Sequence, residues 1–185
     1  MALPIFARAL VLGGIRSGKS EFAETLVDSC ESVQYVATAR HTDAAGMVDP
    51  DWIARIEKHR ARRDRRWTTT EIGSTPEALA TVLEKARPSE AVLVDDIGSW
   101  VHAVMEITKK ADIDEDSARL AAAITGCRAR LVLVSAEVGL SLVPDTAVGR
   151  IFADALGTTN RAVSDACDAV ALVIAGNAMW LKGGP

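Results

Sequence analysis

Aromatic residues are scarce in this sequence, at 4% of its 185 positions. Proteins that hold single-stranded nucleic acids usually stack several bases on aromatic side chains, and few are available in this chain. The formal net charge of −4 also argues against general binding to nucleic acids or to anionic membranes. We therefore expect the partners to be small molecules, with neither a nucleic acid nor a membrane surface among them.

Cysteines and long apolar runs are also lacking. The chain has three cysteines, Cys30, Cys127 and Cys167, which is an odd number and includes no C-x-x-C pair. Their number and spacing indicate neither a disulfide framework nor a zinc site, and they fit a reducing, cytoplasmic location. The longest apolar stretch near the C-terminus is interrupted by Asn177 and is too short to span a bilayer. The apolar start leads into a glycine-rich motif without a cleavage site, so we predict no targeting segment.

What is present is typical of a globular α/β protein. Apolar residues make up 49% and charged residues 25% of the chain, and its length predicts one domain over residues 1–185, with residues 1–7 as a candidate disordered extension. Apolar runs without polar alternation predict central strands at Ala9–Leu12, Val33–Thr38, Trp67–Glu71, Ala91–Asp95, Leu131–Ser135 and Ala169–Ala175, with Met179–Leu181 as a late edge strand. Helices are predicted at Lys19–Cys30, Asp51–Arg63, Pro76–Lys85, Asp116–Ala129 and Ala147–Ala166, and surface loops at Arg40–Val48 and Lys109–Asp116. This alternation predicts a mostly parallel sheet with helices on both faces.

Residues 13–20 match the phosphate-loop pattern G-x-x-x-x-G-K-[ST] in full, between a predicted strand and a predicted helix. Glycines let backbone N–H groups turn toward phosphate oxygens, Lys19 would reach the β- and γ-phosphates, and the Ser20 hydroxyl would bind Mg²⁺. The predicted nucleotide-binding residues of this loop are Gly13, Gly14, Ile15, Arg16, Ser17, Gly18, Lys19 and Ser20. The motif and its context predict a P-loop NTPase-type fold.

A second part of such a site is expected where a buried strand ends in a carboxylate. The run AVLVDD, residues 91–96, fits this pattern, and we assign Asp95 to the Mg²⁺ side. Two alternatives stay open: Asp95 caps the following helix, or Asp96 also approaches the metal. Because no Asn is followed by Lys, the N-K-x-D guanine-reading signature of switch GTPases is missing. The chain length favours a small-molecule kinase or a nucleotidyltransferase.

Positive charge is concentrated in one segment, residues 55–66, which reads RIEKHRARRDRR. Its net charge is +5 (seven basic and two acidic residues), whereas the rest of the chain carries −9 (14 basic and 23 acidic residues). Arginines pair with phosphate oxygens, and their charge would keep the enclosed His59 neutral and able to act as a nucleophile. A solvated basic helix with a structural histidine is the alternative, and nucleic-acid binding by this helix is a less favoured one. His41 and His102 receive no role.

Several motifs together resemble one family. These are GGIRSGKS (13–20), YVATAR (35–40), the basic segment with its histidine, AVLVDDI (91–97) and LVLVSAEVGLSLVP (131–144). In this order the chain resembles the bifunctional adenosylcobinamide kinase / adenosylcobinamide-phosphate guanylyltransferases of cobalamin biosynthesis. The resemblance runs from about Leu10 to the C-terminal strand.

The resemblance implies two reactions and a set of residues. ATP or GTP would phosphorylate adenosylcobinamide, and GTP would then guanylylate His59, which passes GMP to adenosylcobinamide phosphate to give adenosylcobinamide-GDP. Lys19 would be a second catalytic residue in addition to His59, and Ser20 and Asp95 would hold Mg²⁺. Further nucleotide contacts implied by the family are Ala37, Thr38, Ala39, Arg60, Ala61, Arg62, Arg63, Glu71 and Asp95. A homotrimer is implied as well.

The sequence departs from the family pattern at some positions. Ala136 stands where the family often has Asn, and Arg161 where many members have Gln, so nucleotide preference stays open. Some relatives carry out one reaction only, but the intact phosphate loop and His59 predict both for this chain. The alternative is a single-activity P-loop small-molecule kinase in which His59 is structural. A nucleic-acid-binding ATPase is a further alternative, against which charge and aromatic content both argue.

Overall fold

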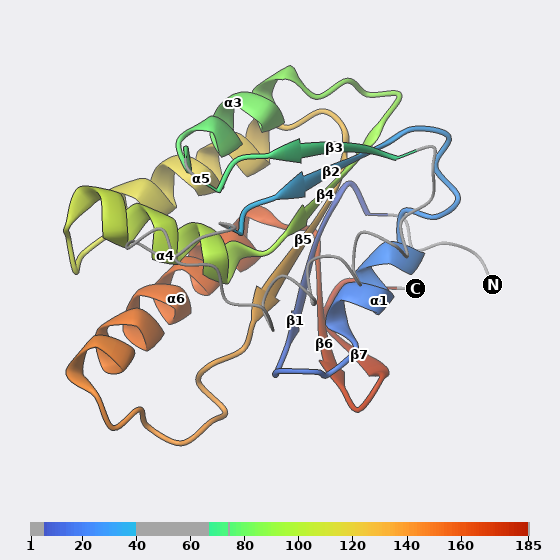
Figure 1. Cartoon of the computed structure of the whole chain (residues 1–185). Helices are drawn as coiled ribbons and strands as arrows, with labels where there is room; N and C mark the ends of the chain where they lie inside the picture. The colour runs from blue at the N-terminus through green and yellow to red at the C-terminus, as the bar shows by residue number, and fades with distance from the viewer. Residues whose placement is uncertain (1–5, 40–66, 74, 185) are drawn as a thin grey trace.

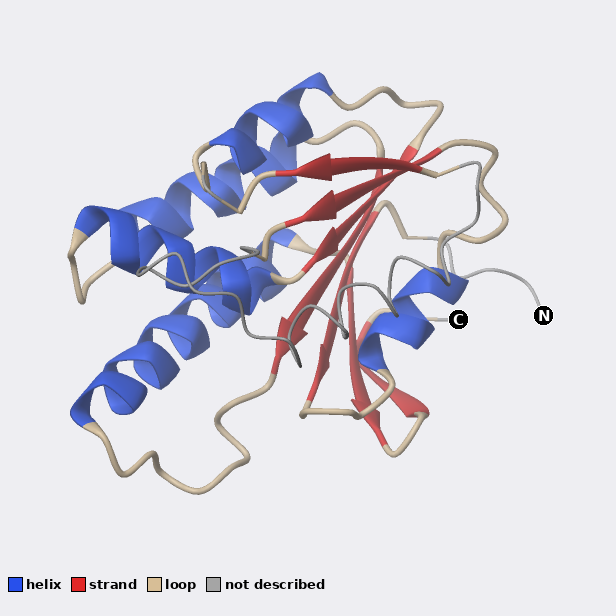
Figure 2. Ribbon diagram, in the orientation of Figure 1, coloured by secondary structure: helices blue, strands red, loops and turns tan. Residues whose placement is uncertain are grey.

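The computed structural model describes residues 6–39, 67–73 and 75–184 and contains a seven-stranded sheet in the order β3-β2-β4-β5-β1-β6-β7. The strands are β1 (Arg8–Gly13), β2 (Val33–Ala37), β3 (Thr68–Glu71), β4 (Ala91–Asp95), β5 (Arg130–Ala136), β6 (Ala169–Ile174) and β7 (Asn177–Lys182). All neighbours run parallel except β7, which pairs antiparallel with β6 at one edge. The carboxyl ends of the parallel strands therefore share one edge of the sheet (Figure 2).

Helices cover both faces of this sheet, unequally among the described elements (Figure 1). One face carries α1 (Lys19–Thr25), and the other carries α3 (Ala78–Lys85), α4 (Ile97–Thr108), α5 (Asp114–Gly126) and α6 (Ala147–Ala166). Alternate residues of a strand point to opposite faces. On β5, Leu131 and Leu133 join the core under α3–α6, whereas Val132 and Val134 join the core under α1. Both faces of the central strands are thus apolar, as the uninterrupted apolar runs predict.

The predicted fold class is confirmed, and the six parallel strands begin and end within one residue of their predicted bounds. Two helix predictions need correction. Helix α1 ends at Thr25 instead of Cys30, and the chain continues in tight turns such as the Cys30 N–H bond to the Val27 carbonyl. Helix α5 begins at Asp114, inside the predicted loop Lys109–Asp116. Its first turn is acidic, and negative side chains favour the start of a helix.

Phe6 and Ala7, which were predicted to belong to a candidate disordered extension, are part of the fold. Phe6 is buried, with its ring 6.1 Å from that of Trp180. The Ala7 N–H donates to Asp168, and its carbonyl accepts from Leu131. The predicted loop at 40–48 and helix at 51–63 lie outside the described residues. Within the described part of the chain, no helix combines the length and apolar character that crossing a membrane requires.

Candidate nucleotide-binding site

The candidate site lies at the carboxyl edge of the sheet, where several predicted residues meet in register. Ala37 at the end of β2 is paired with Glu71 on β3 and with Asp95 on β4. On the other side of β5, Gly13 at the end of β1 pairs with Ala136. In open parallel sheets, ligands bind beyond the carboxyl ends of the strands. The topology thus brings the phosphate loop to the same edge as the predicted acidic strand.

The phosphate loop connects β1 to α1 and depends on its glycines. A Cβ atom on Gly13 would lie 2.4 Å from Ser17 Oγ and 2.8 Å from the Val173 carbonyl oxygen, so a larger residue cannot fit there. Gly18 has φ 92° at the N-cap of α1, a left-handed conformation that glycine adopts without steric cost. These residues fix a tight loop whose outer positions, Ile15 and Arg16, are exposed.

Lys19 and Ser20 follow the loop at the start of α1, and both are partly accessible. The Lys19 ammonium donates to the Gly14 carbonyl oxygen at 3.3 Å, so it folds back over the loop. Its charge also lowers the pKa of Asp96, although other causes outweigh this effect. The structure therefore brings the predicted catalytic lysine, the loop and the acidic pair at the end of β4 within electrostatic reach of one another.

The turn between β6 and β7 packs against the phosphate loop, a contact that the sequence did not indicate. Gly176, with φ 79°, donates its N–H to the Ser17 carbonyl at 2.8 Å. A Cβ atom on Gly18 would come within 3.2 Å of the Gly176 Cα, so the two turns approach closely. A turn near the C-terminus thus holds the loop that lies near the N-terminus.

Asp95 and Asp96 are neighbours in sequence but have different surroundings. The Asp95 carboxylate accepts a hydrogen bond from the hydroxyl of Tyr35 at 2.7 Å. Asp96 is the N-cap of α4, where its carboxylate accepts from the Ser99 N–H at 2.6 Å. Burial, and then the nearby charge of Asp95, raise the pKa of Asp96. The alternative that Asp95 caps the helix is therefore wrong, since Asp96 has that role.

The turn after β2 holds the other described candidates, and Thr38 is fully buried in it. The Thr38 N–H donates to the Asp95 carbonyl at 3.2 Å. Its hydroxyl donates to the Asp96 carbonyl at 2.6 Å and accepts from the Asp96 N–H at 2.8 Å. Ala37 and Ala39 on either side are half-buried. This turn is thus bonded directly to the end of β4.

The oxygen donors near the loop suit Mg²⁺, which prefers carboxylate, hydroxyl and phosphate oxygens and keeps several waters. Ser20 in α1 would supply a hydroxyl. Asp95, in phase with Ala91 and Leu93 on the side of the sheet that carries α1, would supply a carboxylate. Among the described residues no cluster of three or more His, Cys, Asp or Glu side chains forms a metal cage. This donor set fits a metal that arrives with the phosphates of a nucleotide and is not held by protein ligands alone.

Of the remaining predicted site residues, the structure describes only Glu71. Glu71 is an exposed residue at the end of β3, paired with Ala37 on the neighbouring strand β2. The basic segment with His59, Arg60, Ala61, Arg62 and Arg63 lies outside the described residues. The roles that the resemblance implies for this segment therefore stay predictions.

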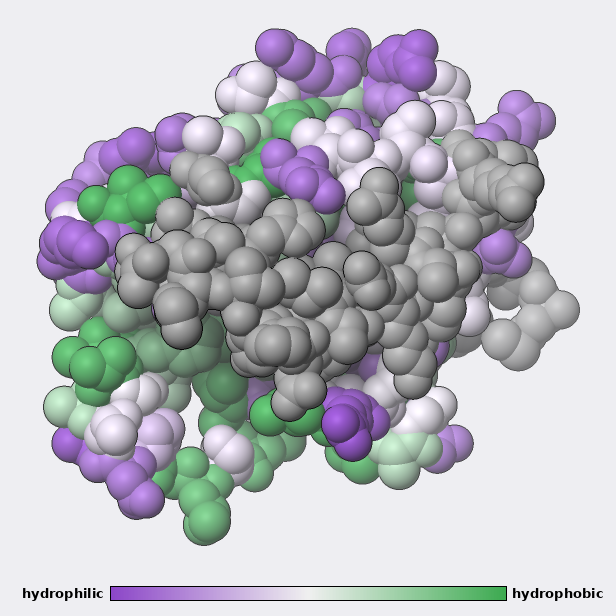
Figure 3. All heavy atoms as spheres, in the orientation of Figure 1, coloured by the Kyte–Doolittle hydropathy of each residue, from purple (hydrophilic) through white to green (hydrophobic). Residues whose placement is uncertain are grey.

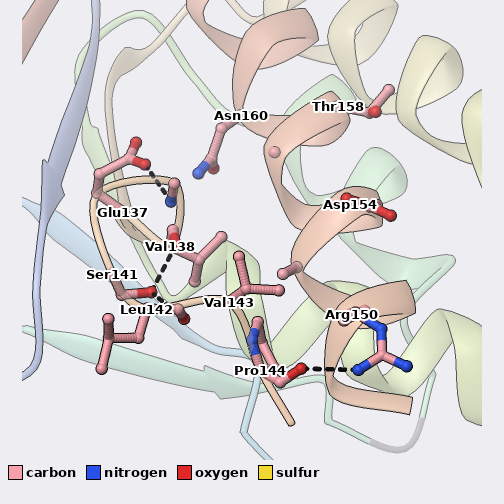
Figure 4. A pocket seen from close by; sticks show the side chains of 13 residues that line it. Glu137, Val138, Ser141, Leu142, Val143, Pro144, Arg150, Asp154, Thr158 and Asn160 are labelled. Atoms are coloured by element: carbon pink, nitrogen blue, oxygen red, sulfur yellow. Dashed lines mark hydrogen bonds between the residues drawn. The ribbon is translucent and has the colours of Figure 1, made fainter. Parts of the chain in front are cut away.

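A pocket of about 500 Å³ lies between the β5–α6 loop and α6 (Figure 4). It was not predicted from the sequence. It adjoins the phosphate loop, because the Glu137 N–H donates to the Gly13 carbonyl at 3.1 Å. Buried Asn160 fixes its inner end by accepting from Ser135 at 2.6 Å and donating to the Ala136 carbonyl at 3.0 Å. The sequence feature that could have indicated this pocket is Asn160, a polar residue among the buried residues of α6. The loop itself exposes the apolar side chains of Leu140, Leu142 and Val143. Green, apolar atoms are visible at the lower left of Figure 3, where this loop lies.

Comparison with known proteins gives a consistent result. The model of the family described as cobinamide kinase / cobinamide phosphate guanyltransferase matches residues 9–181. A protein of Pseudomonas aeruginosa named bifunctional adenosylcobalamin biosynthesis protein CobP is 37% identical over 180 residues, covering 96% of this chain and 99% of that protein. The bifunctional adenosylcobalamin biosynthesis protein CobU of Salmonella typhimurium is 33% identical over 190 residues, covering 94% and 98% of the two chains.

Among solved structures, a type III secretion system ATPase of pathogenic bacteria aligns with a TM-score of 0.58 at 10% identity, covering 89% of this chain and 50% of that one. This likeness supports the P-loop ATPase-type fold and nothing more specific. The family match and the two nearly full-length relatives are decisive for family membership. The chain belongs to the cobinamide kinase / cobinamide phosphate guanyltransferase family.

Proposed function

We propose that this chain phosphorylates adenosylcobinamide with ATP or GTP and then joins GMP from GTP to adenosylcobinamide phosphate, giving adenosylcobinamide-GDP. The observation that carries the proposal is the complete phosphate loop between β1 and α1 in a member of this family. Both reactions use a nucleoside triphosphate, and the described residues include groups that would bind one.

In the kinase step the substrate hydroxyl attacks the γ-phosphorus and loses its proton to the solvent. The bond from that phosphorus to the β–γ bridging oxygen breaks, and a nucleoside diphosphate leaves. Backbone N–H groups of residues 14–20 would hold the phosphates. The Lys19 ammonium, which lies 3.3 Å from the Gly14 carbonyl oxygen of the loop, would turn toward the β- and γ-phosphates and offset their charge. Ser20 and Asp95 would hold Mg²⁺, which when bound neutralises charge that develops on the phosphoryl oxygens.

In the transferase step His59 is proposed as the nucleophile. An imidazole nitrogen attacks the α-phosphorus of GTP, the bond to the β-phosphate breaks, pyrophosphate leaves, and the imidazole loses its proton. The phosphate of adenosylcobinamide phosphate then attacks the same phosphorus and releases the histidine. Support comes from the resemblance of the basic segment to the family and from the affinity of arginines for phosphate oxygens. The nucleotide contacts of Ala37, Ala39, Glu71 and Arg60–Arg63 belong to this proposal, as do a homotrimer and a cytoplasmic location.

The test is a product assay with purified protein, adenosylcobinamide, Mg²⁺ and either ATP or GTP. We expect wild type to form adenosylcobinamide phosphate with a triphosphate and adenosylcobinamide-GDP when GTP is present. His59→Ala should stop at the phosphate, whereas His102→Ala, which changes an exposed histidine on α4, should make both products. Phosphorylation without any GMP transfer by wild type would reduce the function to a single-activity kinase. No phosphorylation would refute the proposal.

A further inference from the structure

We propose that Tyr35 and Thr38, both from the β2 segment, are positioning residues that hold Asp95 in place to bind the metal of a metal–nucleotide complex. The inference rests on the proposed function, since it concerns the Mg²⁺ that would accompany the triphosphate. It also changes the role of Thr38 from a nucleotide contact to a support for the carboxylate.

The hydrogen bonds of Thr38 are the first argument. A threonine hydroxyl carries one hydrogen, and Thr38 donates it to the Asp96 carbonyl oxygen at 2.6 Å. The same oxygen accepts from the Asp96 N–H at 2.8 Å, and the Thr38 N–H is bonded to the Asp95 carbonyl. The side chain is 1% exposed. Thr38 therefore has no hydrogen left to donate to a phosphate, and its bonds fix the backbone that follows the Asp95 carboxylate, from the Asp95 carbonyl to the Asp96 carbonyl.

Tyr35 supplies the second argument. It is the single tyrosine of the chain and is 3% exposed, with its hydroxyl 2.7 Å from Asp95 Oδ2. Its ring lies in the core under α1, so the hydroxyl approaches Asp95 from the face that carries the phosphate loop. This hydrogen bond to Asp95 Oδ2 restricts rotation of the carboxylate and so fixes the direction in which it faces. Partners of this kind, which orient a metal ligand, commonly change metal affinity or activity 10- to 100-fold when they are removed.

The test measures metal binding separately from catalysis. Binding of Mn²⁺ to the complex of the protein with β,γ-imido-GTP is titrated by electron paramagnetic resonance, and nucleotide binding is titrated separately in EDTA. We expect Tyr35→Phe and Thr38→Val to weaken Mn²⁺ binding about 10-fold while leaving nucleotide affinity in EDTA unchanged. Thr38→Ser keeps the hydroxyl and should keep the Mn²⁺ affinity of wild type.

A matched control is available in another buried hydroxyl. Ser117 on α5 is 2% exposed, and its oxygen lies 2.8 Å from that of Thr159 on α6, under the opposite face of the sheet. Ser117→Ala should change stability without changing Mn²⁺ affinity. Thermal unfolding of each variant confirms that the measured proteins are folded, and Thr38→Ser serves as the folded reference should Thr38→Val not fold.

The outcomes separate the inference from the proposed function. Wild-type Mn²⁺ affinity in folded Tyr35→Phe would overturn the positioning role of Tyr35. A loss of nucleotide affinity in EDTA for Thr38→Val would show that Thr38 contacts the nucleotide directly, and would overturn its positioning role. Failure of wild type to bind β,γ-imido-GTP at all would instead refute the nucleotide site on which the proposed function depends.

Discussion

The two faces of the central sheet are used for different purposes. The face under α3–α6 is a continuous apolar core to which four helices contribute, including fully buried Leu79, Leu120 and Leu156. The face under α1 has a smaller apolar core and carries the phosphate loop, Lys19 and the hydrogen bond from Tyr35 to Asp95. One face therefore provides most of the apolar packing, and the other combines packing with the groups that are predicted to bind phosphate.

The difference between the two faces is clearest at Asp95 and Asp96, because β4 ends at Asp95 and Asp96 begins the connection to α4. Asp95 follows the phase of Ala91 and Leu93, which lie in the core under α1. Asp96 lies beyond the end of β4, and its carboxylate caps α4, the helix that follows on the opposite face. Of these adjacent carboxylates, Asp96 has a structural role as the helix cap, and Asp95 is the one we propose for metal binding.

The largest effect is expected from Lys19→Ala. The variant removes the positive charge beside the phosphate loop, and we expect the rate of phosphorylation of adenosylcobinamide to fall on the order of a thousandfold. Lys85→Ala is the control on the other face, since Lys85 is exposed at the end of α3. Initial rates under saturating nucleotide measure both, and a Lys19→Ala variant with near wild-type rate would contradict the assignment.

The next effect distinguishes the two aspartates. Asp95→Asn should lower Mg²⁺-dependent phosphorylation about a hundredfold, because the amide is a poor ligand for the metal. Asp96→Asn should retain most activity and a similar melting temperature, since asparagine caps a helix as well as aspartate does. Kinetics and thermal unfolding of both variants provide the test. Equal losses of activity would mean that both carboxylates serve the metal.

A smaller effect is expected at the turn that supports the phosphate loop. Gly176→Ala places a side chain at φ 79° and should cost about 1 kcal/mol while loosening the bond to the Ser17 carbonyl. We therefore expect the KM for GTP to rise several-fold. Gly126→Ala, at an open position at the end of α5, is the control and should leave KM unchanged. An unchanged KM in Gly176→Ala would separate this turn from nucleotide binding.

The smallest effect concerns the cysteines, which also divide between the faces. Burial raises the pKa of Cys167 to about 12 and raises that of Cys127, and both lie in the core under α3–α6. Cys30 is partly accessible on the α1 side. Because the thiolate is the reactive form, iodoacetamide at pH 8 should modify Cys30 first and leave the other two protected in folded protein. Peptide mapping after labelling checks this, and early modification of Cys167 would contradict its burial.

Sequence reasoning succeeded where the information is local. The strands are uninterrupted apolar runs, and the phosphate loop is contiguous, so both could be predicted from spacing alone. Contacts between distant residues could not be predicted. Thr38 and Asp96 are 58 positions apart, and Gly176 reaches Ser17 across most of the chain. The different roles of Asp95 and Asp96 depend on strand phase and on where α4 begins, which a run of two aspartates does not specify.

The central claim is that this chain uses GTP both as a phosphate-loop ligand and as the source of a GMP carried on His59. The most direct measurement is the intact mass of the protein after incubation with GTP and Mg²⁺, without any corrinoid, for wild type and His59→Ala. We predict that wild type gains one GMP, that acid removes it, and that the variant gains none. Wild-type protein that is folded and binds GTP but gains no GMP would contradict the claim and leave a kinase with a structural histidine.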